Sequence, residues 1–293
     1  MQGVERFVES GAVRIWTERA GDPGCPAVLL IAGSAAQGVS WPDALVGGLV
    51  ARGVQVIRFD HRDTGRSSVV DFDADPYTIG VMARDCLAVL DGHGIASAHV
   101  VGASLGGVLA QWLAVHAPAR VRSLTLLATT PMGSRRDGLP PPAPEFLAHL
   151  AAGLPPGVES DVALFRVFNG AVRPFDEPAA RAMLELARSR AGDPAAAAHH
   201  DRAAWRADPS VDAPLASIVA PTTILHGDQD PVFSLGHGTA LAAAIPGAVL
   251  HLVPGMGHVL TSPGLPEEIA GLIRLARSSP SNSPPCRWPR SST

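Results

Sequence analysis

The sequence predicts an α/β fold, in which a mostly parallel sheet is flanked by helices and carries an inserted helical cap. Short apolar runs alternate with helix-like segments through most of the chain. Several of these runs are apolar throughout, as expected of strands buried on both faces. Between residues 131 and 215, by contrast, only helix-like segments follow one another. We therefore expect a core made of residues 1–130 and 216–277, a cap or lid over 131–215, and a disordered tail at 278–293.

Composition narrows the possible functions. The chain has 293 residues, 46% of them hydrophobic, and a net charge of -4, so we expect a sizeable core and no nucleic-acid groove. It contains no lysine, which excludes lysine Schiff-base chemistry and a lysine-type phosphate loop. Three widely spaced cysteines, Cys25, Cys86 and Cys286, are too few for a metal cluster or a disulfide framework. No signal pattern or membrane-length apolar run is visible, so a soluble cytoplasmic protein is expected.

The predicted elements follow from apolar periodicity and from the residues that interrupt it. Ser10 and Gly11 predict a hairpin, and Gly53, Gly92 and Gly94 stand where helices are expected to end. The predicted strands are 6–10, 13–18, 26–31, 54–59, 122–128, 222–226 and 249–253, together with the short apolar run, Val100 and Val101, that leads into Gly102. The predicted core helices are 41–52, 78–92, 108–116, 236–245 and 266–277.

Residues 98–107, Ala-His-Val-Val-Gly-Ala-Ser-Leu-Gly-Gly, organise the rest of the chain. An apolar run leads into Ser104 and a helix-like segment follows, which predicts a strand, a sharp turn and a helix with serine at the apex. Gly102 and Gly106 carry no side chain where strand and helix crowd together. The five-residue pattern alone would arise by chance about 0.2 times in such a chain, but its context favours a nucleophile elbow over an ordinary loop serine.

A loop of small residues, 32–38, directly follows the buried run at 26–31. After a central strand, such a loop is expected to supply a backbone donor for an oxyanion. We assign one donor to the N–H of Leu105 and the second to the N–H of Ser34. Gly33 and Ala35 remain alternatives for the second donor, and a plain turn is the interpretation without function.

Residues 60–67, Asp-His-Arg-Asp-Thr-Gly-Arg-Ser, carry a dense set of charges. A catalytic role is one interpretation. We favour a polar turn whose carboxylates and arginines pair locally and cap the following segment. His61 is the one side chain of this stretch that could face a pocket.

The cap is predicted from four helix-like pieces, 145–152, 159–170, 178–191 and 195–207, which follow a Pro/Gly-rich entry. Such a lid would close over the site and exclude water. Its apolar residues at helical spacing are expected to pack between cap and core: Phe146, Leu150, Leu164, Phe165, Phe168, Met183, Leu186 and Trp205. The pair His199-His200 is not expected to bind a metal, because adjacent helical residues point in different directions.

Three side chains are expected at the carboxyl ends of the strands, where ligands bind in open parallel sheets: Ser104, Asp230 and His258. We predict that His258 takes the proton of Ser104 and later returns it to the leaving group. Asp230 is predicted to hold the imidazole in the right tautomer and to stabilise its charged form.

Each of the two partners of the serine has rivals. Asp230 is preferred to Asp228 because Pro231 sets a turn directly after it. His258 is preferred because it alone follows a Gly-rich loop after the last predicted strand. The rival histidines lie within predicted strands, where a buried core histidine is expected, or at a helix start: His226, His251 and His237.

Six stretches carry a resemblance to a known family: 41–43, 60–67, 88–92, 99–102 with Ser104 and Gly106, 230–231, and 254–258. Together they resemble the α/β-hydrolase superfamily, and more closely the actinomycete methylesterases of anthracycline biosynthesis, the aclacinomycin methylesterase type. The resemblance covers most of residues 5–275, the cap only weakly. In that family a second glycine stands at Ser34, and leucine and methionine stand at Ala103 and Leu105.

The resemblance implies ester hydrolysis, in antibiotic biosynthesis, of a methyl ester of a polyketide-type metabolite. We therefore expect a serine esterase acting on a small, apolar ester, with no cofactor, no metal, no nucleic acid and no membrane as partner. A peptidase, lactonase or perhydrolase on the same triad is an alternative. A non-catalytic ligand-binding homologue is another, although a binder has no need of all three triad residues.

Overall fold

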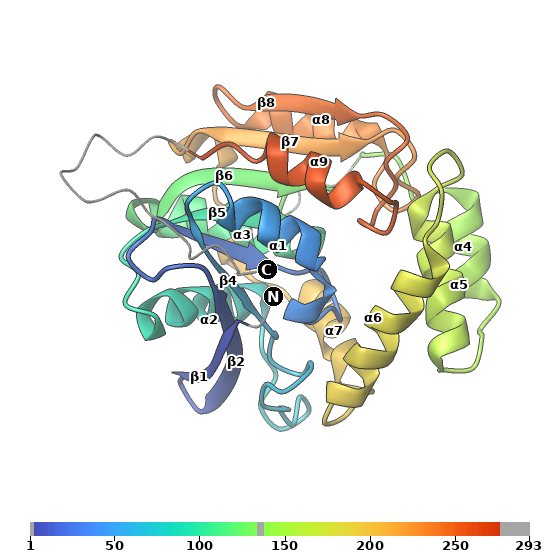
Figure 1. The fold of residues 1–293 in the computed structure, drawn as a ribbon, viewed down its shortest axis with the longest axis horizontal. Coiled ribbons are helices and arrows are strands. Elements are labelled where there is room, and N and C mark those ends of the chain that lie inside the picture. Colours follow the sequence, from blue (N-terminus) through green and yellow to red (C-terminus); the bar gives the residue numbers. More distant parts are fainter. Residues whose placement is uncertain (1–2, 134–137, 276–293) are drawn as a thin grey trace, which may run out of the picture.

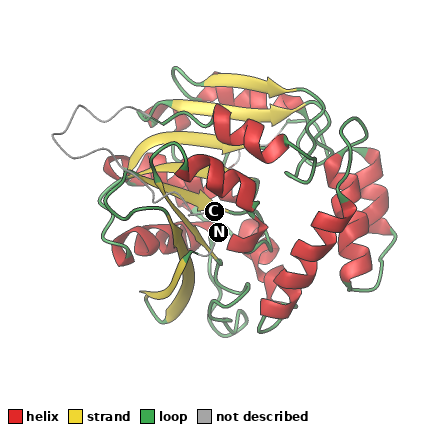
Figure 2. Ribbon diagram, in the orientation of Figure 1, coloured by secondary structure: helices red, strands yellow, loops and turns green. Residues whose placement is uncertain are grey.

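The computed structural model describes residues 3–133 and 138–275. These residues form an eight-stranded sheet in the order β1-β2-β4-β3-β5-β6-β7-β8 (Figures 1 and 2). β1 pairs with β2, and β2 with β4, in antiparallel fashion, while all other neighbours are parallel. The predicted mostly parallel sheet is thus confirmed. The strands are β1 (Val4–Ser10), β2 (Val13–Ala20), β3 (Ala27–Ile31), β4 (Gln55–Phe59), β5 (Ala98–Ala103), β6 (Val121–Leu127), β7 (Thr222–Gly227) and β8 (Val249–Val253).

The helices also fall where the periodicity predicts them, apart from their ends. The α-helices are α1 (Asp43–Val50), α2 (Ile79–Gly92), α3 (Leu105–His116), α4 (Pro144–Ala151), α5 (Val158–Asn169), α6 (Glu177–Arg190), α7 (His199–Trp205), α8 (Leu235–Ala244) and α9 (Leu265–Leu272). The prediction that the last helix reaches residue 277 is wrong, because Ile273 is already extended (φ -61°, ψ 115°). The expected tail at 278–293 lies outside the described residues.

The sheet is covered by helices on both faces, and β3 shows why. Its five residues are all buried, and they alternate between two apolar clusters. Leu29 and Ile31 pack with residues of α2, α3 and α8, whereas Val28 and Leu30 pack with residues of α1 and α9. Because successive side chains of a strand point to opposite faces, a continuous apolar run can serve both clusters at once.

Helices α4 to α7 lie between β6 and β7 in the sequence, and Figure 1 shows α4, α5 and α6 beside the sheet. Three apolar residues expected to pack against the core are instead exposed, so that prediction is wrong for them: Leu150 (56%), Leu186 (49%) and Trp205 (86%). Helical spacing reveals an apolar face but not whether another element covers it. Here α4 has no buried residue at all.

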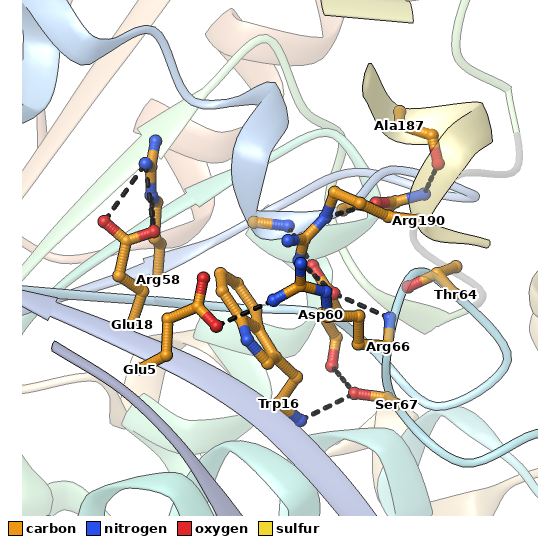
Figure 3. A network of polar contacts seen from close by, with 12 residues as sticks. Glu5, Trp16, Glu18, Arg58, Asp60, Thr64, Arg66, Ser67, Ala187 and Arg190 are labelled. Atoms are coloured by element: carbon orange, nitrogen blue, oxygen red, sulfur yellow. Dashed lines mark hydrogen bonds and ion pairs between the residues drawn. The ribbon is translucent and has the colours of Figure 1, made fainter. Parts of the chain in front are cut away.

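The carboxyl-terminal end of α6 is fastened to the core through Arg190 (Figure 3). The Arg190 guanidinium donates to Asp60 Oδ2 at 2.7 Å, and the two side chains are 6% and 0% exposed. It also lies over the ring of Trp16, 4.1 Å from its centroid. One turn earlier, Gln37 Nε2 donates to the carbonyl of Ala187 at 2.6 Å. These contacts tie α6 to β2 and to the loops after β3 and β4.

Replacing Arg190 by leucine is expected to lower the free energy of unfolding by about 3–5 kcal/mol, because it leaves the buried Asp60 carboxylate without its charged partner. Arg181→Leu, in the same helix, is the matched control. Its partners Glu159 and Glu177 are 82% and 38% exposed, so the loss of these solvent-exposed ion pairs should lower the free energy of unfolding far less. Urea unfolding measures both, and equal losses would contradict a buried anchor.

Candidate active site

Ser104 occupies a one-residue turn between β5 and α3. Its backbone has φ 52° and ψ -123°, a region that residues other than glycine rarely adopt. The turn is held by two backbone bonds, from Ser104 N to Leu127 O at 3.0 Å and from Gly107 N to Ser104 O at 2.9 Å. The strand–turn–helix predicted around this serine is therefore present, and its strained apex presents the hydroxyl beyond the sheet.

The two glycines flanking the turn are required by close backbone contacts. A Cβ atom on Gly102 would lie 2.2 Å from the carbonyl oxygen of Gly106. A Cβ atom on Gly106 would lie 2.1 Å from the carbonyl oxygen of Ile31, at the end of β3. Backbone atoms cannot give way as a flexible side chain can, so both positions admit only glycine. The close approach of α3 to β3 and β5 is what sets Ser104 in place.

The structure brings Ser104, His258 and Asp230 together from three separate strand ends. His258 Nε2 lies 3.1 Å from Ser104 Oγ, and His258 Nδ1 lies 2.9 Å from Asp230 Oδ2. Asp230 Oδ1 also accepts the backbone N–H groups of Val232 and Phe233, at 2.8 and 2.9 Å. These bonds orient the carboxylate toward the imidazole.

The surroundings of Asp230 favour its ionised form. Its side chain is fully buried. Burial alone would raise the pKa of the carboxyl, but the interaction with His258 and the hydrogen bonds from His258 and Phe233 N outweigh it and lower the pKa below its usual value. The carboxylate is therefore charged at neutral pH and can stabilise a protonated imidazole beside it.

The rival residues have other partners. Asp228 is exposed and accepts the backbone N–H of Gly255 at 2.7 Å. His226 is a buried strand histidine, as expected, with Nε2 2.7 Å from Phe233 O. His237 lies 2.8 Å from Thr130 Oγ1. His251 is only half-buried in β8, so the expectation of a buried core residue is wrong there.

The loop that follows β3 passes close to Ser104, since a Cβ atom on Gly33 would lie 3.2 Å from the Cβ of the serine. Ala35 N already donates to His200 Nδ1 at 3.0 Å, so it is not available as a second oxyanion donor. Within the described residues the N–H of Ser34 has no hydrogen-bond acceptor. Leu105 begins α3, and the first N–H groups of a helix have no acceptor within it.

The charged stretch 60–67 is a polar turn, but its partners are largely distant, which corrects the expected local pairing. Arg62 forms two bonds with Asp85 on α2, both at 2.7 Å, and Asp60 binds Arg190 from the cap. His61 does not face a pocket. It is 1% exposed, and its Nε2 lies 3.0 Å from Ala32 O. Burial lowers the pKa of His61 to about 3, so the neutral ring donates to that carbonyl.

The end of α5 packs directly on the loop that carries His258. The backbone N–H of His258 donates to Phe168 O at 2.6 Å. The rings of Phe168 and Phe233 lie 5.3 and 5.6 Å from the imidazole. Asn169, almost fully buried, accepts the hydroxyls of Thr261 and Ser262 at 2.9 Å each. Sequence reasoning missed Asn169, because a single polar residue at a helix end carries no distinguishing signal.

Aromatic side chains gather around His258, whereas the cavity beside Leu105 is small. That cavity, of about 30 Å³, is lined by residues of α2, α3, α7 and the segment that follows α7, together with Gly133: Ile79, Leu105, Val108, Ala204, Arg206, Asp208 and Val211. Beyond His258, the ring of Phe168 is 5.6 Å from that of Phe146 and 6.0 Å from that of Phe165. Four of the chain's eight phenylalanines thus gather at or near the imidazole.

The two adjacent cap histidines bind protein groups. His199 Nδ1 lies 3.1 Å from Asp63 Oδ2, and His200 binds backbone on both ring nitrogens. Across residues 3–133 and 138–275, no cluster of three or more His, Cys, Asp or Glu side chains is arranged to hold a metal ion. In the same part of the chain, every helix is too short or too polar to span a bilayer.

Comparisons with known proteins agree with the fold. A family model described as alpha/beta hydrolase fold matches residues 26–262. The chain is 37% identical over 280 residues to the rhodomycin D methylesterase DnrP of Streptomyces peucetius, which covers 87% of this chain and 92% of that protein. It is 32% identical over 232 residues to a putative carbamate hydrolase, RutD, of Variovorax paradoxus, which covers 79% and 84%. A solved hydrolase structure from Pseudomonas aeruginosa matches with a TM-score of 0.71 and 28% identity, over 92% and 96% of the two chains.

Proposed function

This chain belongs to the α/β-hydrolase family, and from that premise we propose that it is a serine esterase, a cofactor-free enzyme that cleaves a carboxylic ester through an acyl-enzyme on Ser104. The observation that carries the proposal is the continuous hydrogen-bonded chain from Asp230 through His258 to Ser104, with distances of 2.9 and 3.1 Å. Such distances allow direct proton transfer between imidazole and hydroxyl.

In the acylation step, Ser104 Oγ attacks the ester carbonyl carbon while its proton passes to His258 Nε2. The C–O bond to the alcohol then breaks, and His258 gives the proton to the leaving alkoxide oxygen. In deacylation, a water molecule gives one proton to His258, and its oxygen attacks the acyl carbon. The bond to Ser104 Oγ breaks, the serine takes back the proton, and the carboxylic acid leaves. Asp230 stabilises the imidazolium in both steps.

The negative charge on the substrate's carbonyl oxygen is assigned to two backbone donors, the N–H groups of Leu105 and Ser34. Both belong to segments that crowd the serine, one at the start of α3 and one in the loop after β3. A donor of this kind contributes about 3–4 kcal/mol to lowering the barrier, because it binds the oxyanion more strongly than the ground-state carbonyl.

The substrate we propose is a methyl ester of a polyketide-type secondary metabolite. The likeness to a rhodomycin D methylesterase over most of both chains supports it. So do the aromatic side chains at the site, because the rings of Phe168 and Phe233 lie 5.3 and 5.6 Å from the imidazole. A large apolar acyl group gains from such contacts, whereas methanol, the alcohol released, needs little space.

A fluorophosphonate probe tests the mechanism before any substrate is known. We expect the probe to label the folded wild-type protein on Ser104, as located by peptide mass spectrometry. Turnover is then compared for methyl esters of polycyclic aromatic acids, short-chain methyl esters and lactones. Faster turnover of the polycyclic methyl esters is expected. Faster turnover of lactones would show that the preferred substrate is a lactone and not a methyl ester. Failure of the probe to label Ser104 would contradict the mechanism.

A further inference from the structure

One cap residue, His200 on α7, is in direct contact with the loop assigned to the oxyanion. Its side chain is fully buried. Nδ1 lies 3.0 Å from Ala35 N and Nε2 lies 2.8 Å from Arg62 O. The N–H of Ala35 can only donate and the carbonyl can only accept, so Nδ1 carries no proton and Nε2 carries one. Burial lowers the pKa of His200 below its usual value, which keeps the ring in this neutral form.

The turn that His200 contacts is unusual in its backbone. Ala35 has φ 58°, the left-handed region that residues with a Cβ rarely adopt. Among the described residues, the turn is closed by a single backbone–backbone hydrogen bond, from Ala36 N to Gly33 O, which is long at 3.3 Å. A strained residue persists only where its surroundings hold it. The bond from Ala35 N to the imidazole is the contact that holds this one.

Two further contacts fasten the same loop on the amino-terminal side of Ala35. Ser34 Oγ donates to Asp201 Oδ1 at 2.9 Å, so two consecutive residues of α7 bind two consecutive residues of the loop. At the loop's start, His61 Nε2 donates to Ala32 O, and the rings of His61 and His200 meet edge to face, 5.4 Å apart. The segment carrying Ser34 N is therefore set between two neutral imidazoles.

We propose that His200 is a positioning residue of the oxyanion hole: by accepting the N–H of Ala35 it fixes the turn that aims the N–H of Ser34 at the reacting carbonyl oxygen. This inference rests on the proposed function. It makes α7 of the cap a support for the chemistry, in addition to any role as a lid. The support acts through backbone geometry, so it should matter for the transition state and little for ground-state binding.

The decisive comparison is His200→Asn with His200→Gln. Asparagine places an acceptor oxygen near the position of Nδ1 and can keep the bond to Ala35 N. Glutamine reaches the position of Nε2 and can keep only the bond to Arg62 O. We expect kcat on an activated ester to fall about 10- to 100-fold in the glutamine variant, with KM little changed. The asparagine variant should stay within about fivefold of the wild type, because it keeps the bond to Ala35 N.

Inhibition by a trifluoromethyl ketone provides the second readout, since its adduct with Ser104 carries an oxyanion. Its inhibition constant should rise in His200→Gln by the same factor as kcat/KM falls. His199→Ala is the control for a general disturbance of α7, because its ring binds Asp63 and not the loop. Melting temperatures check that each variant is folded.

Equal kcat values for the asparagine and glutamine variants, whether high or low, would overturn the role of His200. So would a tenfold or greater fall in His199→Ala. Failure of the proposed function is seen separately: in that case the wild-type protein itself hydrolyses no ester and reacts with no fluorophosphonate. An active wild type with equal His200 variants would leave the esterase assignment intact.

Discussion

Replacement of Ser104 by alanine is expected to lower the turnover of an activated ester by about a millionfold, because only the oxyanion donors and substrate binding would remain. The fold should be unaffected. The bonds that hold the turn, to Leu127 O and from Gly107 N, are made by the backbone of Ser104 and not by its hydroxyl. Initial rates with a 4-nitrophenyl ester measure the activity, and thermal unfolding checks the structure.

Ser189→Ala is a suitable control for the substitution itself. The hydroxyl of Ser189 is exposed on α6, and within the described part of the chain it donates only to Leu186 O, in its own helix. This variant should retain wild-type turnover. If Ser104→Ala kept more than about one part in a hundred of the activity, contributions from the oxyanion donors alone could not explain it, and Ser104 would not be the nucleophile.

Replacement of Asp230 by asparagine is expected to lower turnover by about ten-thousandfold, because the amide NH₂ would favour the wrong tautomer of His258. In the wild-type protein, His258 Nδ1 lies 3.1 Å from Asp230 Oδ1 and 2.9 Å from Oδ2, and it donates to this carboxylate. An amide donor in that place leaves Nε2 carrying the proton, so the imidazole could no longer accept the proton of Ser104.

Asp228→Asn is the matched control, two residues away on the same loop. Among residues 3–133 and 138–275, its exposed carboxylate accepts only the N–H of Gly255, and an amide oxygen accepts that N–H as well. Turnover should stay within about threefold of the wild type, since a neutral acceptor costs a fraction of a hydrogen bond. An inactive Asp228→Asn beside an active Asp230→Asn would reverse the assignment of the acid.

The elements of the core could be predicted because their causes are local. The run at 26–31 is apolar throughout, and the structure buries every residue of β3 because both faces of the sheet are covered. Helix ends were harder to predict where the apolar pattern continues beyond them. The end of α9 is marked only weakly: Gly271 stands one residue before it, but apolar residues continue at Leu272, Ile273 and Leu275, so the pattern extends a helix that the structure ends at Leu272.

Long-range partners could not be predicted from one sequence. Asp60 and Arg190 are 130 residues apart, and nothing in the spacing of charges around residue 60 indicates which arginine will bind it. The exposure of Trp205 is a similar case. Its helical spacing is that of a packed residue, but its exposure depends on which elements lie alongside α7.

The same distinction between local patterns and long-range contacts applies to the residues of the site. Ser104, Asp230 and His258 could be chosen because each follows a predicted strand and the three occur in a recognisable order. His200 could not. In the sequence it is one of two adjacent histidines in a helix-like segment, a pattern that suggests a metal site, which helix geometry argues against. Its contact with Ala35 exists only once α7 lies against the loop after β3.

The end of α5 packs on the loop that carries His258, and this contact limits how the cap can be replaced by that of a related enzyme. Besides the bond from His258 N to Phe168 O, a Cβ atom on Gly257 would lie only 2.1 Å from that same carbonyl oxygen. In a chimaera built to accept another substrate, the end of α5 through Asn169 belongs with the recipient core and not with the donor lid. A donor lid that replaced Phe168 and Asn169 would shift the loop that carries the general base, His258, together with the substrate wall.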